Sequence, residues 1–147
     1  MTLPTGTAAP AFTGKDTNGN IVKLSDFAGR ILVIYFYPKD DTPGCTKEAC
    51  SFRDNYSAYL RNNIAVLGVS RDDEISHQKF SEKYSLPFPL IADSDGIITK
   101  AYDAEKSSEK AKRVTYVIDD IGRITQVYEG DNLIPETHAQ DILKTLL

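Results

Sequence analysis

The sequence is poor in cysteine. Two of its 147 residues are cysteines, Cys45 and Cys50, and both lie in one short segment. A small secreted scaffold held by disulfides would carry more cysteines, so this class is not indicated. A structural zinc site needs four ligands, and the two histidines, His77 and His138, stand far from the cysteines without finger-like spacing. We therefore expect no metal site, and we expect the thiol chemistry to be local.

An excess of positive charge and a long apolar run are also missing. The formal net charge is −4, so the basic surface of a nucleic-acid or anionic-membrane binder is not expected. No apolar run approaches the roughly 20 residues that span a bilayer. The first residues (MTLP) lack the basic and apolar regions of a secretory signal. We therefore expect a cytoplasmic protein, or an organellar one from which a transit peptide has been removed.

The composition is typical of one globular domain. Hydrophobic residues make up 41% and charged residues 26% of the chain. The sequence contains no repeats, low-complexity stretches or long linkers, and its length is common for one compact domain. We expect a single domain over residues 1–147.

Two strongly apolar runs predict buried strands, at Ile31–Tyr37 and Ile64–Ser70. Between them, Pro43–Arg61 shows helical spacing of apolar residues. The expected core positions of this helix are Ala49, Phe52, Tyr56, Tyr59 and Leu60. Strand, helix and strand form a βαβ unit, whose crossover should be right-handed.

The rest of the chain predicts further elements in a recognisable order. A helix is expected at Asp73–Tyr84, with Ile75, Phe80 and Tyr84 facing the core. The other expected elements are a hairpin joining Ala11–Thr13 to Ile21–Leu24 through Asn18-Gly19, an extended segment at Leu86–Leu90, a short helix at Gly96–Tyr102, strands at Arg113–Asp119 and Arg123–Glu129, and a final helix at Pro135–Leu147 with Pro135 in its first turn. This order is that of a thioredoxin-like α/β fold: a mixed central β-sheet flanked by helices on both faces, with an N-terminal β-hairpin.

The segment between the first buried strand and the following helix carries both cysteines. Thr42 suits the N-cap and Pro43 the first helical position, which makes Cys45 the third residue of the helix. The unpartnered N–H groups of a first turn and the helix dipole favour thiolate over thiol, so we expect Cys45 to be largely ionised at neutral pH. The alternative is a buried, inert cysteine. Polar neighbours argue against it: Lys39, Asp40, Asp41, Lys47 and Glu48.

Cys50 lies five residues after Cys45. On an intact helix their Cα atoms would be roughly 8–9 Å apart, whereas a disulfide usually needs about 4.4–6.8 Å. Either Cys50 is a core residue on another face, or the start of the helix unwinds after Cys45 is oxidised. Gly44 lowers the helix stability of this turn, which favours unwinding.

The residues around Cys45 resemble those of the peroxiredoxins. Pro38, Thr42 and Cys45 match the family motif of proline, three residues, threonine, two residues and cysteine. The longer run YFYPKDDTPGCTKEAC is similar to the subfamily called peroxiredoxin Q, or bacterioferritin comigratory protein. Similar stretches follow in the expected order (GVS at 68–70, SHQKF at 76–80, LPFPL at 86–90 and RVTYVID at 113–119), so the resemblance covers nearly the whole chain.

The resemblance implies a role for each matching residue. Cys45 matches the peroxidatic cysteine, Cys50 the resolving cysteine, Thr42 the threonine that contacts peroxide and thiolate, Pro38 the proline that shields the pocket, and Arg113 the active-site arginine. The resemblance also implies reduction of hydrogen peroxide and organic hydroperoxides, with thioredoxin or a similar dithiol as reductant. It further implies no bound cofactor and, often, a monomer.

Topology supports Arg113 independently. Its strand should run antiparallel to Ile31–Tyr37, which would bring Arg113 beside the cysteine loop. A permanent cation there would favour the Cys45 thiolate and polarise a peroxide. The alternative is a surface arginine. His77 has no evident acid partner in the sequence, so we expect it to be structural or exposed.

Two other functions remain open for the same pair of cysteines. A thiol-disulfide oxidoreductase usually carries Cys-x-x-Cys, whereas four residues separate the cysteines here. A non-catalytic redox sensor would be oxidised once and would transmit a change to a partner. Peroxide consumption with turnover separates the peroxidase from both.

Overall fold

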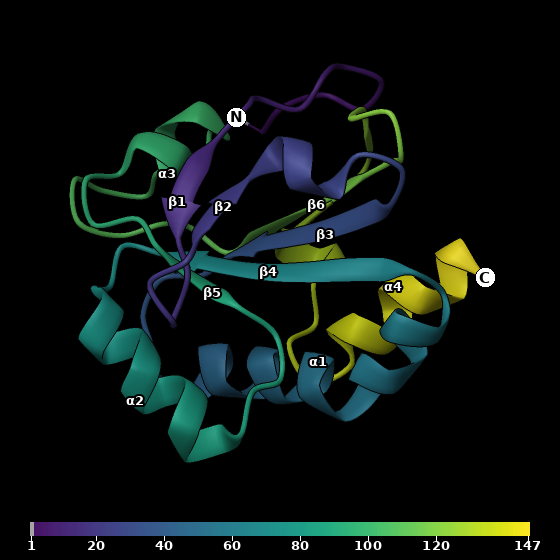
Figure 1. Cartoon of the computed structure of the whole chain (residues 1–147). Coiled ribbons are helices and arrows are strands. Elements are labelled where there is room, and N and C mark those ends of the chain that lie inside the picture. The colour runs from purple at the N-terminus through teal and green to yellow at the C-terminus, as the bar shows by residue number, and fades with distance from the viewer. Residues whose placement is uncertain (1) are drawn as a thin grey trace.

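The computed structural model describes residues 2–147 and is built around a five-stranded sheet in the order β5-β4-β3-β6-β7 (Figure 1). Its strands are β3 (Ile31–Phe36), β4 (Ile64–Ser70), β5 (Leu90–Ala92), β6 (Val114–Ile118) and β7 (Ile124–Glu129). Strands β3, β4 and β5 are parallel, while β6 is antiparallel to both β3 and β7. The predicted thioredoxin-like fold with a mixed sheet is confirmed.

The two faces of the sheet are covered differently. Below the sheet in Figure 1 lie α1 (Pro43–Arg61), α2 (Glu74–Tyr84) and α4 (His138–Leu146). The opposite face carries the hairpin of β1 (Thr13–Lys15) and β2 (Ile21–Lys23), the 3-10 helix η1 (Leu24–Phe27) and the short helix α3 (Ile97–Ala101). A second 3-10 helix, η2 (Gly130–Asn132), follows β7.

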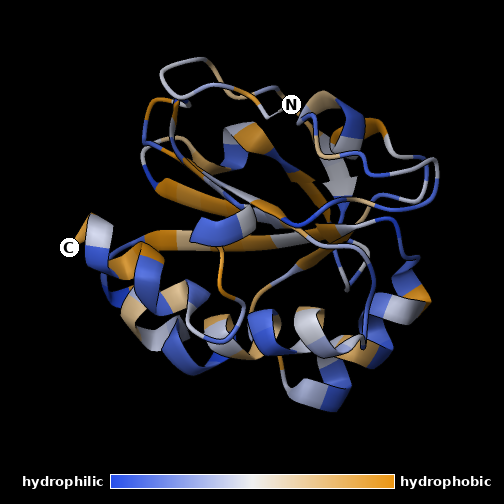
Figure 2. Cartoon of the chain, turned by 180° about the vertical axis from the view of Figure 1, so that it is seen from behind, coloured by the Kyte–Doolittle hydropathy of each residue, from blue (hydrophilic) through white to orange (hydrophobic). Residues whose placement is uncertain are grey.

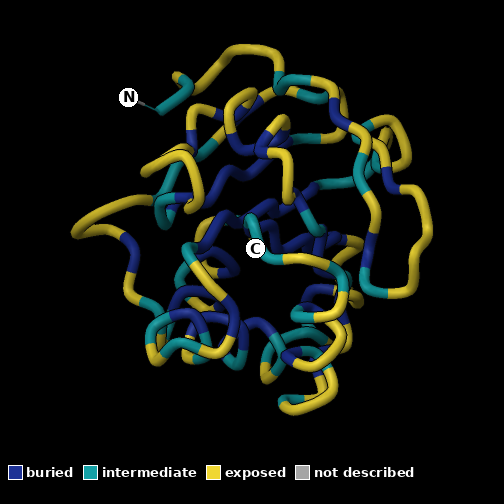
Figure 3. Tube along the Cα trace, turned by 90° about the vertical axis from the view of Figure 1, so that its left-hand side faces the viewer, coloured by how far each residue is buried: buried dark blue, intermediate teal, exposed yellow. Residues whose placement is uncertain are grey.

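The core is divided by the sheet into two apolar clusters. Because successive side chains of a strand point to opposite faces, Leu32 and Ile34 join one cluster while Val33 and Tyr35 join the other. Figure 2 shows the apolar residues concentrated on the strands, with polar residues on the outward sides of the helices. In Figure 3 the buried chain lies centrally and the exposed loops lie outside it. Among residues 2–147 there is no helix with both the length and the apolar character needed to cross a membrane.

Helix α1 has the bounds that its sequence predicts. Thr42 occupies the N-cap position with extended backbone angles (φ −96°, ψ 155°), and Pro43 is the first helical residue. Three of the predicted core positions are buried, namely Ala49, Phe52 and Tyr59. Tyr56 is half-buried, and the prediction for Leu60 is wrong because its side chain is 58% exposed. The face of α1 that packs against the core therefore ends at Tyr59, one residue before the last apolar position that the sequence predicted.

The core-facing side of α2 was predicted only in part. Phe80 is buried and Tyr84 half-buried, as expected, but Ile75 is 63% exposed. The inward position near the start of α2 belongs instead to His77, which is completely buried. His77 and Phe80 are three residues apart and therefore share one face of the helix. A polar residue can occupy this face because it finds partners there, including Asp40.

Several other boundaries shift by one to three residues. Helix α4 begins at His138 rather than Pro135. The Thr137 N–H first closes a separate turn by donating to the Ile134 carbonyl. The first bond of the helix then runs from the Asp141 N–H to the Thr137 carbonyl. The N-terminal hairpin pairs 13–15 with 21–23 across a five-residue loop, in which Asp16 accepts two backbone N–H bonds. The predicted Asn18-Gly19 turn lies inside this loop, and Gly19 has φ +79°.

Helices α1 and α4 are joined by buried hydrogen bonds. The Tyr59 hydroxyl donates to the carbonyl of Ala139 at 2.8 Å, and the Ala139 N–H donates to Ser51 Oγ at 3.0 Å. These contacts secure α1 from Ser51 onward, whereas its first two turns lie outside them. These bonds therefore fix the body of the helix to α4, whereas its start is bonded to Arg113.

Two buried tyrosines offer a matched test of hydrogen bonding in this core. The Tyr35 hydroxyl has no hydrogen-bond partner among residues 2–147, whereas the Tyr59 hydroxyl bonds to Ala139. We expect Tyr59→Phe to lower the free energy of unfolding by about 1 kcal/mol, and Tyr35→Phe to leave it unchanged or raise it. Urea denaturation of the reduced protein measures both. A larger loss in Tyr35→Phe than in Tyr59→Phe would contradict this assignment.

Candidate active site

Three elements bring the candidate residues together at one edge of the sheet. A loop leads from the end of β3 to the start of α1, which carries Cys45. Strand β6 pairs antiparallel with β3, and Val114 is opposite Phe36 at the last register position. Arg113 immediately precedes Val114, so the sheet register places it beside the start of α1.

The Cys45 side chain is buried, with 1% of its surface exposed. The polar neighbours in the sequence predicted an accessible thiol, and that expectation is wrong. The surroundings are nevertheless not inert, because Arg113 Nη2 donates a hydrogen bond to Cys45 Sγ at 3.2 Å. Burial disfavours a charged sulfur, whereas a guanidinium in contact favours it. Cys45 therefore lies in a buried but electropositive position at the N-terminus of a helix.

Glu48 is the second partner of Arg113. Arg113 Nη1 donates to Glu48 Oε1 at 2.7 Å, and the Glu48 side chain is completely buried. Burial raises the pKa of Glu48 to about 7, although Arg113 acts in the opposite direction. Desolvation tends to lower the pKa of Arg113, but Glu48 and Cys45 together raise it above its usual value. The guanidinium thus spans two residues on the first two turns of α1.

A buried histidine lies behind Glu48. His138 Nε2 is 3.8 Å from Glu48 Oε2 and 2.8 Å from Thr115 Oγ1. Burial lowers the pKa of His138 to about 4, so its ring is neutral at pH 7. Sequence reasoning did not identify Glu48 or His138 as part of the site. Glu48 could have been found, because a residue three positions after Cys45 shares its helix face.

Thr42 and Pro38 lie in the loop that precedes α1, and both are half-buried. The Thr42 side chain makes no capping bond to the helix, and its hydroxyl donates instead to the carbonyl of Lys39 at 2.8 Å. Thr42 therefore begins α1 through its backbone conformation, while its side chain stabilises the loop.

Cys50 is half-buried on the same helix, and both thiols are free. Burial raises the pKa of the Cys50 thiol above its usual value. Because α1 is a regular helix through both cysteines, their Cα atoms are separated by roughly 8–9 Å by helix geometry. A disulfide between them therefore requires the start of α1 to unwind.

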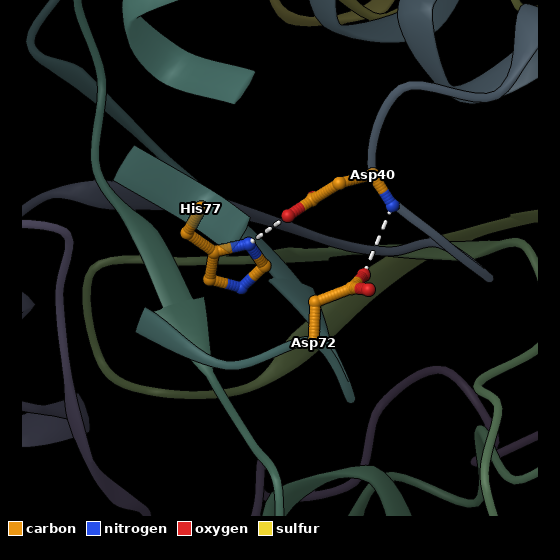
Figure 4. Close-up of side chains that lie close together, drawn as sticks. All are labelled: Asp40, Asp72 and His77. Atoms are coloured by element: carbon orange, nitrogen blue, oxygen red, sulfur yellow. Dashed lines mark hydrogen bonds and ion pairs between the residues drawn. The ribbon is translucent and has the colours of Figure 1, made fainter. Parts of the chain in front are cut away.

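His77 is buried, which agrees with the structural alternative of the prediction and excludes the exposed one. The acid partner that the sequence did not reveal is Asp40, whose Oδ2 lies 2.7 Å from His77 Nδ1 and which comes from a loop 37 residues earlier (Figure 4). Asp40 and His77, with Asp72, form the one group among residues 2–147 whose side-chain atoms lie close enough to share a metal ion. No local pattern in the sequence connects these positions.

The comparisons with known proteins agree with this geometry. The AhpC/TSA family matches residues 5–127. A chloroplastic peroxiredoxin Q of Oryza sativa subsp. japonica is 43% identical over 143 residues, which cover 96% of this chain and 65% of the rice protein. The chain thus spans about two thirds of the length of that relative. A putative peroxiredoxin bcp of Coxiella burnetii is 42% identical over 135 residues, covering 87% of this chain and 89% of the relative.

Solved structures give the same result. Peroxidoxin BcpB from Mycobacterium tuberculosis superposes with a TM-score of 0.90 at 30% identity, covering 98% of this chain and 96% of that one. A mutant of Xanthomonas campestris peroxiredoxin Q superposes with a TM-score of 0.85 at 33% identity, covering 92% and 89%. The resemblance read from the motif is confirmed: the chain belongs to the AhpC/TSA family, as a peroxiredoxin of the Q and bcp type.

Proposed function

We propose that this protein is a thiol-dependent peroxidase in which Cys45 reduces a hydroperoxide and Cys50 resolves the oxidised cysteine as an intramolecular disulfide. The observation that carries the proposal is the position of Arg113, which bonds Cys45 Sγ at 3.2 Å and Glu48 at 2.7 Å beside a helix N-terminus. A Xanthomonas campestris bacterioferritin comigratory protein, 32% identical to this chain, is described by its alkyl peroxide reduction activity. That similarity supports hydrogen peroxide and organic hydroperoxides as the substrates.

In the first step, the Cys45 thiolate attacks one oxygen of the hydroperoxide along the O–O bond. An S–O bond forms, the O–O bond breaks, and the leaving oxygen takes up a proton to become an alcohol or water. Arg113 and the first-turn N–H groups would stabilise the charge that develops on this oxygen, and the Thr42 hydroxyl would join them by leaving the Lys39 carbonyl to which it donates. The half-buried Pro38 would shield the pocket from water. Cys45 becomes a sulfenic acid.

In the second step, the Cys50 sulfur attacks the Cys45 sulfenic sulfur, the S–S bond forms and water leaves. The first turns of α1 must unwind to bring the two sulfurs together. Unwinding would also expose Cys50, which removes the burial that raises the pKa of its thiol. A dithiol of the thioredoxin type then returns both cysteines to the thiol state by exchange, supplying two electrons.

The proposal includes an assembly state and a location. Arg113, Glu48 and both cysteines all come from one chain, which supports a monomer as the active unit. A redox cycle that ends in reduction by a dithiol supports a reducing compartment. We propose the cytoplasm, although the similar rice protein is named as chloroplastic.

Serine variants separate the two cysteine roles. We expect Cys45→Ser to abolish peroxide-dependent NADPH oxidation with thioredoxin and thioredoxin reductase, because no sulfur remains to attack. Cys50→Ser should form one sulfenic acid per chain, detectable by intact-protein mass, but should not turn over by this route. Should Cys45→Ser consume peroxide as fast as the wild type, the proposal is wrong and a redox-sensor or structural role takes its place.

Replacement of Arg113 by lysine tests the two-contact geometry. Lysine keeps the positive charge, but its one ammonium group lacks the planar fork of nitrogens with which arginine bonds the Cys45 sulfur and the Glu48 carboxylate at the same time. We expect Arg113→Lys to slow oxidation of Cys45 about 100-fold, measured by stopped-flow mixing with hydrogen peroxide. Lys112→Ala is the control, since Lys112 approaches Glu129 at 3.9 Å on the neighbouring strand. Equal rates in the wild type and Arg113→Lys would show that charge alone suffices.

Glu48→Gln tests the buried carboxyl that holds Arg113. Its pKa is raised from 4.5 to about 7, so between these values the folded state keeps a proton that the unfolded chain has lost. The contribution of Glu48 to stability therefore falls as pH rises through this window. The glutamine side chain does not titrate, so on going from pH 5 to pH 8 the wild type should lose about 2.5 kcal/mol more unfolding free energy than the variant.

Urea denaturation of the reduced proteins at the two pH values measures this difference. The lowered pKa of His138 has the opposite effect on stability, but His138 is present in both proteins. The same pH dependence in the wild type and Glu48→Gln would show that Glu48 ionises as it does in the unfolded chain.

A further inference from the structure

A cluster of two buried residues and one half-buried residue beside the active site joins the loop before Cys45 to α2. The cluster consists of Asp40, Asp72 and His77, and no step of the proposed mechanism uses it (Figure 4). We propose that Asp40 and His77 are positioning residues, whose ion pair holds this loop and thereby aligns the first turn of α1, with Cys45, against Arg113. The inference rests on the proposed peroxidase function and deepens it.

The Asp40 carboxylate is buried and fully partnered. Its Oδ1 accepts a hydrogen bond from the Tyr37 hydroxyl at 2.6 Å, and its Oδ2 accepts one from Ser76 Oγ at 2.8 Å. The same Oδ2 lies 2.7 Å from His77 Nδ1, and the two side chains of this pair are 4% and 0% exposed. A carboxylate so removed from water needs such partners, because an unpaired buried charge is strongly unfavourable.

The His77 ring has an acceptor on each side. Nδ1 faces Asp40, and Nε2 lies 2.9 Å from the carbonyl oxygen of Ile91 in β5. With Asp40 as a carboxylate, both contacts are hydrogen bonds when both ring nitrogens carry hydrogen, which is the arrangement of an ion pair. The pair therefore ties the loop to α2 and, through α2, to the sheet.

The backbone of the loop is held as well. The Asp40 N–H donates to Asp72 Oδ2 at 2.9 Å, and the same oxygen accepts from Ser70 Oγ at 2.6 Å, at the end of β4. The next residue, Asp41, has φ +58°, an unfavourable conformation for a residue with a side chain. A conformation of this kind persists only when the surroundings fix it. The buried contacts of Asp40 supply that constraint directly beside the strained residue.

The position of this loop decides the position of Cys45. Thr42 begins α1 two residues after Asp40, and Cys45 follows in the first turn. Arg113 reaches α1 through bonds of 3.2 and 2.7 Å, so a small shift of the first turn would misalign them. A displacement of about 1 Å at a reacting group can slow a reaction 100-fold. Disulfide formation, in contrast, requires the segment after Thr42 to leave its helical position, so it does not need this alignment.

A metal ion is a weaker reading of the same cluster. A histidine nitrogen and two carboxylates are ligands that divalent metals accept. Their facing atoms, however, are already joined through hydrogen bonds to one another or to Tyr37, Ser76 and the loop backbone. A metal would have to displace the hydrogen between His77 and Asp40. The contacts therefore favour an ion pair.

The two reaction steps can be measured separately in variants of the pair. The variants are Asp40→Asn, His77→Gln and the double variant, each made with Cys50 present and with Cys50→Ser. Oxidation of Cys45 by hydrogen peroxide is followed by rapid quench and intact mass in the Cys50→Ser proteins. Disulfide formation is followed at saturating peroxide in the proteins with both cysteines.

We expect oxidation to slow at least about 10-fold in each single variant, while disulfide formation stays within about twofold of wild type or becomes faster. Because the two residues act as a pair, the double variant should be no slower than the slower single variant. Lys83→Ala is the matched control, since Lys83 bonds the exposed Asp41 of the same loop from the same helix. An exposed pair contributes little, so both of its rates should stay near wild type.

The inference is overturned if the folded single variants are oxidised at the wild-type rate, or if both steps slow alike as the protein loses stability. It is also overturned if a chelator slows wild-type oxidation as much as His77→Gln does, because a metal would then be the active element. Where circular dichroism shows that a single variant fails to fold, Ser76→Ala takes its place, because it removes one donor to Asp40. This variant must then slow the oxidation of Cys45 without slowing disulfide formation. Wild-type protein without Cys45-dependent peroxide consumption would instead refute the proposed function.

Discussion

The guanidinium of Arg113 is the contact on which the candidate site depends. It bonds Cys45 and Glu48, which lie three residues apart on α1, while its backbone leads into β6. The register of β6 against β3 therefore sets where the guanidinium meets the helix. Cys45 and Glu48 are both buried, and this cation opposes the desolvation that raises the pKa of Glu48. The contact exists only while the first turns of α1 are helical.

In the proposed mechanism, helix α1 thus has two tasks that its intact form cannot perform together. A helical start aligns Cys45 with Arg113, but it keeps Cys50 beyond disulfide distance. The helix is built unevenly in a way that fits both tasks. Its start contains Gly44 and lacks a side-chain cap, whereas Ser51 and Tyr59 bond it to α4. These differences favour unwinding at the first turns, once the bonds of Arg113 are released, over unwinding in the part of α1 that Ser51 and Tyr59 bond to α4.

The fold was largely predictable because its signals are local. Apolar runs identified β3 and β4, and the N-cap, proline and apolar spacing gave the bounds of α1. The placement of Arg113 followed from strand order. The misjudged features depend on contacts distant in sequence. His77 is buried in place of Ile75 because its ring nitrogens find partners in Asp40 and the Ile91 carbonyl. Cys45 is buried because it packs in the apolar cluster between α1 and the sheet, where Arg113 bonds its sulfur. No periodicity in the sequence reports such partners.

Hydrogen exchange of the reduced and the peroxide-oxidised protein, followed by mass spectrometry of peptides from α1, tests most directly whether the site and the disulfide exclude each other. The account predicts protected amides throughout residues 46–61 in the reduced state. In the oxidised state it predicts loss of protection over residues 46–54, because the amides of residues 51–54 lose their carbonyl acceptors at 47–50, and retained protection over residues 55–61. A Cys45–Cys50 disulfide with unchanged protection over residues 46–50 would contradict the account, because the two cysteines would then have bonded on an intact helix.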